Sequence, residues 1–153
     1  AGQADSGDAA REALSNAIVS GAAAERFGKM IGAMGGPLGF VAHPERYLPE
    51  APVIREVTAP KGGFVSAIDG EALGLAVVAL GGGRQVEGDL VNPAVGLSEV
   101  LPLGMKVDKG QPLARVHAAR EEQADRAAQV ISNAMHISTA APVKCDLVQE
   151  VIT

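Results

Sequence analysis

The chain has 153 residues, of which 47% are apolar and 20% are charged. This length is enough for one compact domain with a core, and the composition is that of a globular rather than a disordered protein. The net charge of −5 and the aromatic content of 3% argue against a nucleic-acid partner, which needs a basic surface and stacking side chains.

The compartment is predicted from the cysteine content and the apolar runs. A single cysteine, Cys145, leaves no internal disulfide framework and fits a reducing compartment. The first residues lack the basic start and apolar centre of a signal peptide, and no apolar run is long enough to span a bilayer. We therefore expect a cytoplasmic protein without a membrane partner.

Two helices are predicted at the start of the chain. The first runs from Asp8, as its N-cap, to Val19. The second shows apolar residues at i, i+3, i+4 and i+7, a spacing that predicts a stripe facing a core. The stripe consists of Phe27, Met30, Ile31 and Met34. The sequence thus predicts a helical lead-in segment over residues 1–45, followed by one domain over residues 46–153.

The middle of the chain predicts a strand–strand–helix unit. Short β-rich runs cover residues 53–58 and 64–68, with a Pro/Gly-rich turn between them. Asp69 then caps a helix over Gly70–Leu80, which is apolar almost all round and is therefore expected to be buried on several sides. Within it, replacing Val77 by Asp is expected to bury an unpaired charge and unfold the domain.

The last third is predicted to contain strands over residues 95–103 and 113–118, a helix over residues 121–135 and a final strand over residues 147–152. Strands and helices mix along the chain without strict alternation. This order favours an α+β fold over a doubly wound sheet.

Three blocks of the sequence stand out together. They are SGAAAERFGKMIGAMGGP, GGFVSAIDGEALGLAVVALGGGR and VGLSEVLPLGMKVDKGQPLARVHAA. In combination they resemble the type II nucleoside phosphorylases, the family of the thymidine and pyrimidine-nucleoside phosphorylases, and the second block looks closer to the thymidine enzymes. The likeness runs from about Arg11 to the C-terminus. It implies the family's C-terminal α/β-hammerhead domain, a mixed or antiparallel sheet with packed helices.

The resemblance also implies a parent reaction, in which thymidine and phosphate give thymine and 2-deoxyribose 1-phosphate. Relatives hold phosphate with a Lys-His-Ser and Gly-rich segment and the base with an Arg, a Ser and a Lys, and no counterpart of these occurs here. We therefore expect no catalytic, substrate-binding or metal residue, no cofactor, and no activity of this chain alone. Its expected partner is the upstream part of the parent enzyme, through which phosphate and nucleoside would bind. The full-length protein is expected to be a homodimer.

Arg84 is the one candidate for an indirect functional role. The resemblance implies that the loop Gly82–Gly96 lies near the cleft between domains, where Arg84 would make a domain-closure contact. An anion cradle at Gly81-Gly82-Gly83 is disfavoured, because these residues follow a helix and lie at its partially negative C-terminal end. They are typical of a helix stop.

Other chemically interesting residues have simple structural interpretations. Lys106 follows Met105 as in biotinyl carriers, but it precedes the Gly110-Gln111 element instead of following it, which favours an ordinary turn lysine. Cys145, beside Lys144, has no evident base to activate it.

Histidines and scattered carboxylates complete the set of candidates. The histidines lack metal-ligand spacing, and His117 is interpreted as a packing or hydrogen-bonded residue rather than a general base. The other residues are interpreted as exposed or scattered side chains: His43, His136, Asp89, Glu99 and Asp108.

Three functional hypotheses follow. In the first, the chain is the structural C-terminal portion of a thymidine phosphorylase. In the second, it is a stand-alone module that dimerises through its helices, with the stripe of the second helix left uncovered. In the third, it is a biotinyl- or lipoyl-like carrier, in which Lys106 would carry the group.

Overall fold

The computed structural model describes residues 3–143, so Cys145 and the strand predicted over residues 147–152 lie outside the described residues. The chain divides into two compact units, one ending at Leu48 and one beginning at Pro49. Among residues 3–143, no helix is long and apolar enough to cross a membrane.

The first unit contains the helices α1 (Gly7–Val19) and α2 (Ala22–Ala33) and the short 3-10 helix η1 (Pro44–Arg46). The N-cap of α1 is Ser6, whose hydroxyl accepts a hydrogen bond from the Ala9 N–H at 3.1 Å. The prediction of Asp8 as the cap was therefore wrong. Asp8 lies in the first turn, where its charge still stabilises the helix dipole.

The apolar stripe of α2 does not face a core in this unit. No residue of α2 is buried, and Met34 is 77% exposed. Phe27 packs edge-on against Phe40, with ring centroids 6.3 Å apart, and Phe40 lies 6.2 Å from Tyr47. The predicted core-facing stripe is thus wrong for this chain, because two short helices do not supply a second layer that could cover it.

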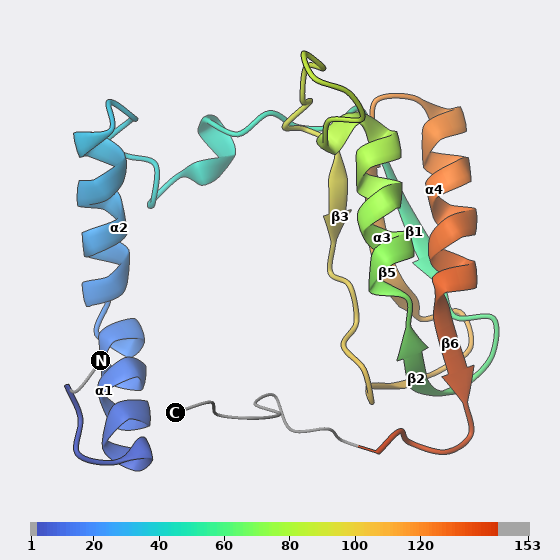
Figure 1. Ribbon diagram of the computed structural model, residues 1–153, viewed down its shortest axis with the longest axis horizontal. Coiled ribbons are helices and arrows are strands. Elements are labelled where there is room, and N and C mark those ends of the chain that lie inside the picture. The colour runs from blue at the N-terminus through green and yellow to red at the C-terminus, as the bar shows by residue number, and fades with distance from the viewer. Residues whose placement is uncertain (1–2, 144–153) are drawn as a thin grey trace. The chain divides into compact units, whose positions relative to one another are not determined.

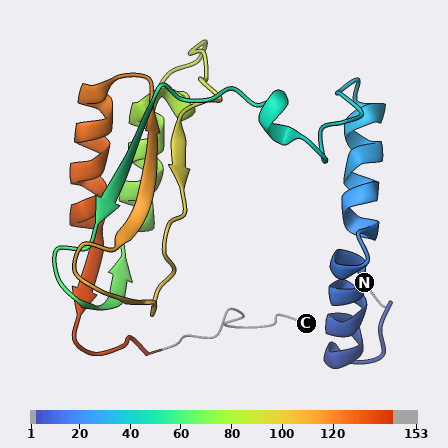
Figure 2. The same ribbon diagram turned by 180° about the vertical axis from the view of Figure 1, so that it is seen from behind.

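The second unit is built on two three-stranded antiparallel sheets, with strand orders β1-β5-β3 and β4-β2-β6. The strands are β1 (Val53–Thr58), β2 (Gly63–Ile68), β3 (Gly96–Ser98), β4 (Lys106–Val107), β5 (Pro112–Ala118) and β6 (Met135–Ser138). The helices α3 (Gly70–Val77) and α4 (Glu121–Ala134) lie side by side on one side of β1 and β5 (Figures 1 and 2). The predicted α+β fold class is confirmed.

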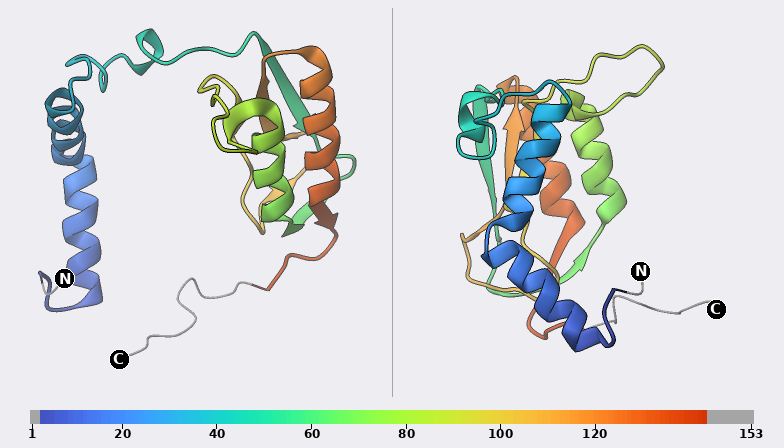
Figure 3. Two further views of the ribbon diagram at one scale, coloured as in Figure 1. Left: turned by 45° about the horizontal axis from the view of Figure 1, so that its top comes forward. Right: turned by 90° about the vertical axis from the view of Figure 1, so that its left-hand side faces the viewer.

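The core lies between the helices and the strands, and Figure 3 shows both helices on the same side of the sheet. Its largest fully buried side chains are Leu113, Ile131, Val65, Val107 and Val116. At the edge of this core, Arg55 of β1 forms ion pairs with Glu121 and Asp125 of α4. The strand β2 leads directly into α3, and α4 leads directly into β6. The Asp69 N–H donates to the Ala134 carbonyl at 2.9 Å where these two junctions meet.

The helix α3 begins as the sequence predicts. The carboxylate of Asp69 accepts a hydrogen bond from the Ala72 N–H at 2.9 Å, which confirms the N-cap. After Val77 the helix widens into a π-type turn, η2 (Val78–Gly82), and Gly81 ends it with a φ of 97°, a conformation that glycine adopts at little cost.

The prediction that this helix is buried on several sides is wrong. Along α3 and η2 only Ala76 and Leu80 are buried, whereas Leu75 is 61% exposed. Val77 is half-buried, so the premise behind the predicted unfolding by Val77→Asp does not hold in this chain. A single side of the helix faces the core.

The later strands also differ from the predicted ones. The strand expected over residues 95–103 stops at Ser98, because Glu99 has a left-handed φ of 52° that interrupts an extended strand. The strand β4 lies between the strands predicted over residues 95–103 and 113–118, and neither β4 nor β6 was predicted. Both pair with β2, so their formation depends on distant residues.

Candidate functional site

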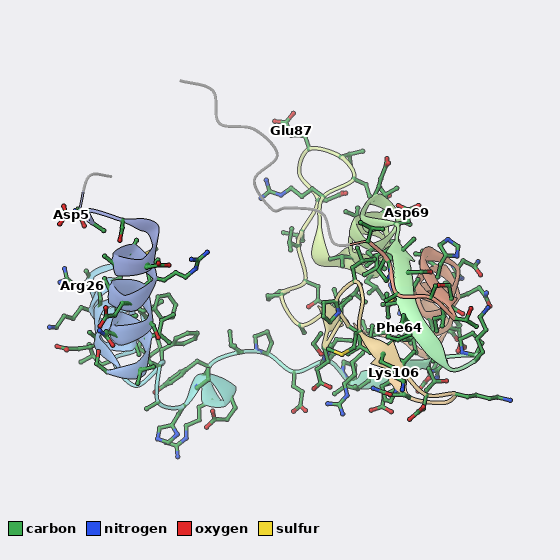
Figure 4. The ribbon with its side chains drawn as sticks, turned by 90° about the horizontal axis from the view of Figure 1, so that it is seen from below. Asp5, Arg26, Phe64, Asp69, Glu87 and Lys106 are labelled. Carbon is green, nitrogen blue, oxygen red and sulfur yellow. The ribbon has the colours of Figure 1, made fainter. Side chains whose placement is uncertain are left out.

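The loop between η2 and β3, residues 83–95, projects from the second unit, and Figure 4 shows Glu87 at its far end. The Asn92 N–H donates to the Gly81 carbonyl at 2.8 Å and closes the base of the loop. The carboxylate of Asp89 accepts hydrogen bonds from the N–H groups of Gln85 and Val86, both at 3.0 Å. These hydrogen bonds within the loop and at its base therefore give it a defined shape.

The loop presents both a cation and apolar side chains to solvent. Arg84 is exposed and forms no ion pair with any residue in the described range. Val86 is exposed, and Leu90 is 95% exposed. An exposed guanidinium beside apolar side chains suits contact with another protein surface better than it suits a closed catalytic site.

Side chains tie β3, which follows the loop, to the neighbouring strand. Ser98 Oγ lies 2.7 Å from His117 Nε2. Arg115 donates to Glu99 at 2.8 Å and to Glu56 of β1 at 3.1 and 3.2 Å. The Arg115 contacts link β5 to β1 and to the residue that directly follows β3.

The Ser98–His117 pair was not anticipated, although His117 is a hydrogen-bonded residue as the sequence indicated. The register of β3 against β5 places Gly96 opposite His117 and Ser98 opposite Arg115, and sequence spacing gives no direct signal for it. Within residues 3–143, no carboxylate is hydrogen-bonded to His117, so the pair lacks the third group that orients a catalytic base. We interpret the pair as an attachment of β3 to β5.

The remaining candidates do not converge on one site. Lys106 lies in β4 opposite Phe64 of β2 (Figure 4), rather than at the tip of the turn that follows. His43 lies in the first unit, 3.4 Å from a carboxylate oxygen of Glu45. His136 is an exposed residue of β6.

The carboxylates likewise form no metal or acid–base cluster. In the part of the chain that the structure describes, no group of three or more His, Cys, Asp or Glu residues is arranged to hold a metal ion. Asp89 stabilises its own loop, and Glu99 pairs with Arg115. Asp108 accepts no hydrogen bond through its side chain from the described residues, although its N–H donates to Gln111.

Comparison with known proteins gives a consistent assignment. Residues 64–138 match the family described as the pyrimidine nucleoside phosphorylase C-terminal domain, a segment that runs from β2 to the end of β6. The chain is also 46% identical over 143 residues to the thymidine phosphorylase of Agrobacterium fabrum, a match that covers 93% of this chain and 33% of that protein. The chain thus spans about a third of the length of this curated relative. Both comparisons thus agree: residues 64–138 match the C-terminal domain of the pyrimidine nucleoside phosphorylases, and the chain is similar to about a third of a thymidine phosphorylase.

Proposed function

We propose that this chain is the structural C-terminal portion of a thymidine phosphorylase, which converts thymidine and phosphate into thymine and 2-deoxyribose 1-phosphate. The observation that carries the proposal is the 46% identity to a curated thymidine phosphorylase over 93% of the chain. In this proposal the upstream part of the parent enzyme binds phosphate and nucleoside, and the chain alone is inactive.

The chemistry of the described residues supports a structural role for this chain and substrate binding by the upstream part. Phosphorolysis needs preorganised groups that hold phosphate and stabilise the charge on the departing base. Such groups usually lie in a site from which water is excluded. No polar or charged residue is buried in the described part of the chain, and Arg55 and Arg115 are paired with carboxylates.

The loop Gly82–Gly96 has a proposed role in domain closure. Its base is closed by a backbone hydrogen bond, and its exposed Arg84 is not paired with any described acid. We propose that Arg84 contacts the rest of the parent enzyme when the cleft between domains closes. Further parts of the proposal are a division into a lead-in over residues 1–45 and an α/β-hammerhead domain over residues 46–153, a homodimeric full-length enzyme and a cytoplasmic location.

A chimeric enzyme tests the proposal. The matched third of the Agrobacterium fabrum enzyme is replaced by this chain, and phosphate-dependent release of thymine is measured beside the same enzyme with that third deleted. We expect activity in the chimera and none in the deletion protein. A folded chimera as inactive as the deletion protein would contradict the proposal.

The same chimera tests Arg84. Arg84→Gln should lower activity because a closure contact is lost, whereas Arg120→Gln, a change of the same kind at another exposed arginine, should not. Equal activities of the two variants would remove Arg84 from the proposal.

A second candidate function is self-association through α2, favoured by the exposure of Phe27, Met30 and Met34. Sedimentation equilibrium of the isolated chain would show a mass that rises with concentration, and Met30→Glu would abolish the rise. A monomer at all concentrations would remove this candidate.

A further inference from the structure

A groove lies on the second unit between α3–η2 and α4. It contains a cavity of about 150 Å³. Ala76 and Leu80 line it from the first helix, and Gln123, Ala127 and Val130 line it from the second. The groove is mainly apolar, and it is open to the outside rather than enclosed in the core.

Two polar side chains of α4 at this groove have unused bonding capacity. The side-chain oxygen of Gln123 is inaccessible to solvent and has no hydrogen-bond partner among the described residues. An oxygen buried without a donor costs free energy, but a group that docks from outside cannot reach this oxygen, so the cost is internal to the domain. Arg126, one helical turn further along, also lines the groove and forms no ion pair within residues 3–143.

The helix beside the groove lacks the polar side expected of a surface helix. From Ala72 to Gly83 the sequence contains no charged residue, yet Leu75 is 61% exposed and Ala79 is also exposed. A helix at a protein surface normally carries charged or polar residues on its outward side. The outward side of α3 therefore has the composition of a buried surface.

We propose that this groove, lined by Ala76, Ala79, Gln123, Arg126 and Val130, forms together with the exposed Leu75 of α3 the docking surface for a segment from the other two thirds of the parent polypeptide. The segment inserts an apolar side chain into the cavity and places a carboxylate beside Arg126. This inference rests on the proposed function.

The length of the relative and the charge of Arg126, which is unpaired among the described residues, indicate what occupies the groove. The curated relative is about three times as long as the part of it that this chain matches, so most of a protein of this kind lies outside the matched region. A carboxylate-bearing segment would give Arg126 the ion pair that the described residues do not supply.

Cysteine reactivity tests the proposal without disturbing the groove greatly. Leu75→Cys is made in a Cys145→Ser background, both in the isolated chain and in the chimera described above, and the rate of maleimide labelling is followed by peptide mass spectrometry. We expect labelling at least about tenfold slower in the chimera, because the docked segment covers the site. Ile54→Cys, at an exposed apolar position of β1 (50% exposed), corrects for any general slowing. Equal rates at Leu75 in the two proteins, after this correction, would overturn the proposal.

Thermal melting tests whether a carboxylate of the docked segment lies beside Arg126. Arg126→Glu should lower the melting temperature of the chimera by about 3 °C or more and leave that of the isolated chain unchanged. An equal change in both proteins would mean that Arg126 acts within this domain, which would contradict a docked carboxylate.

Two controls separate the alternatives. If the isolated chain forms a dimer that Leu75→Glu abolishes, the occupant is a second copy and the proposal is overturned. An inactive chimera in which Leu75 is still protected would remove the proposed function but retain the docking surface.

Discussion

Gly63, the first residue of β2, is a position where one methyl group should disrupt the domain. It pairs with Val107 of β4 and borders Ser138 of β6. Its φ is 152°, a value that residues with a Cβ rarely adopt. A Cβ added there would overlap the carbonyl oxygen of Ser138 and lie 2.9 Å from Cγ2 of Ile137.

The expected cost of Gly63→Ala follows from these contacts. An unfavourable backbone conformation costs about 1–3 kcal/mol, and moving the Ser138 carbonyl away sacrifices β2–β6 hydrogen bonding worth about 1 kcal/mol per bond. We expect a total loss of about 3 kcal/mol in the free energy of unfolding. At about 4–8 °C per kcal/mol for a domain of this size, the melting temperature should fall by about 12–24 °C.

The neighbouring glycine provides a matched control. A Cβ at Gly62 would be 3.6 Å from the nearest atom, the carbonyl oxygen of Val107, which is an ordinary contact. Gly62→Ala should therefore change stability by no more than about 0.5–1 kcal/mol. Calorimetric melting of both variants gives the comparison. A Gly63→Ala protein that melts within a few degrees of the wild type would refute the described packing of β2 against β6.

Four smaller changes test other contacts. Asp69→Ala should lower stability in urea by about 1 kcal/mol through loss of the α3 cap, whereas Asp69→Ser should retain most of it; equal midpoints for the Ala variant and the wild type would contradict the cap. Arg115→Gln should cost no more than about 1 kcal/mol, because its ion pairs with Glu56 and Glu99 are largely exposed, and the cost should shrink in high salt; a salt-independent loss would show another role. Ser98→Ala should shift the ring-proton resonances of His117 and cost about 0.5–1.5 kcal/mol, whereas Ser66→Ala should leave those resonances unchanged; unchanged resonances in the Ser98 variant would exclude the hydrogen bond. Asp89→Ala should speed tryptic cleavage after Arg84 several-fold by loosening the loop, with Asp108→Ala as the control, and unchanged cleavage would mean that Asp89 does not hold the loop.

Local signals in the sequence predicted much of the fold. The β-branched run over residues 53–58, the Asp69 cap and the helical spacing after Glu121 each gave an element that the structure contains with nearly the same bounds. In these cases the information lies within a few neighbouring residues. At the start of the chain the sequence predicted Asp8 as the cap, whereas the structure uses Ser6; both residue types have a side chain that can cap a helix.

Long-range contacts account for most of the differences. The strand β6 pairs with β2, more than sixty residues earlier in the chain, and the Ser98–His117 contact depends on strand register. Helical spacing likewise identified the apolar sides of α2 and α3 but not what covers them. That is why the stripe of α2 and the outward side of α3 were assigned to a core and yet are exposed in this chain.

The most direct test of the account is phosphate-dependent release of thymine from thymidine by the purified isolated chain, with the intact mass of the sample verified. Under the proposed function we expect no release at the mass of this chain, because the chemistry would belong to the rest of the parent enzyme. Release that co-purifies with the chain, and that is lost on mutation of Arg84, Lys106 or His117, would contradict it.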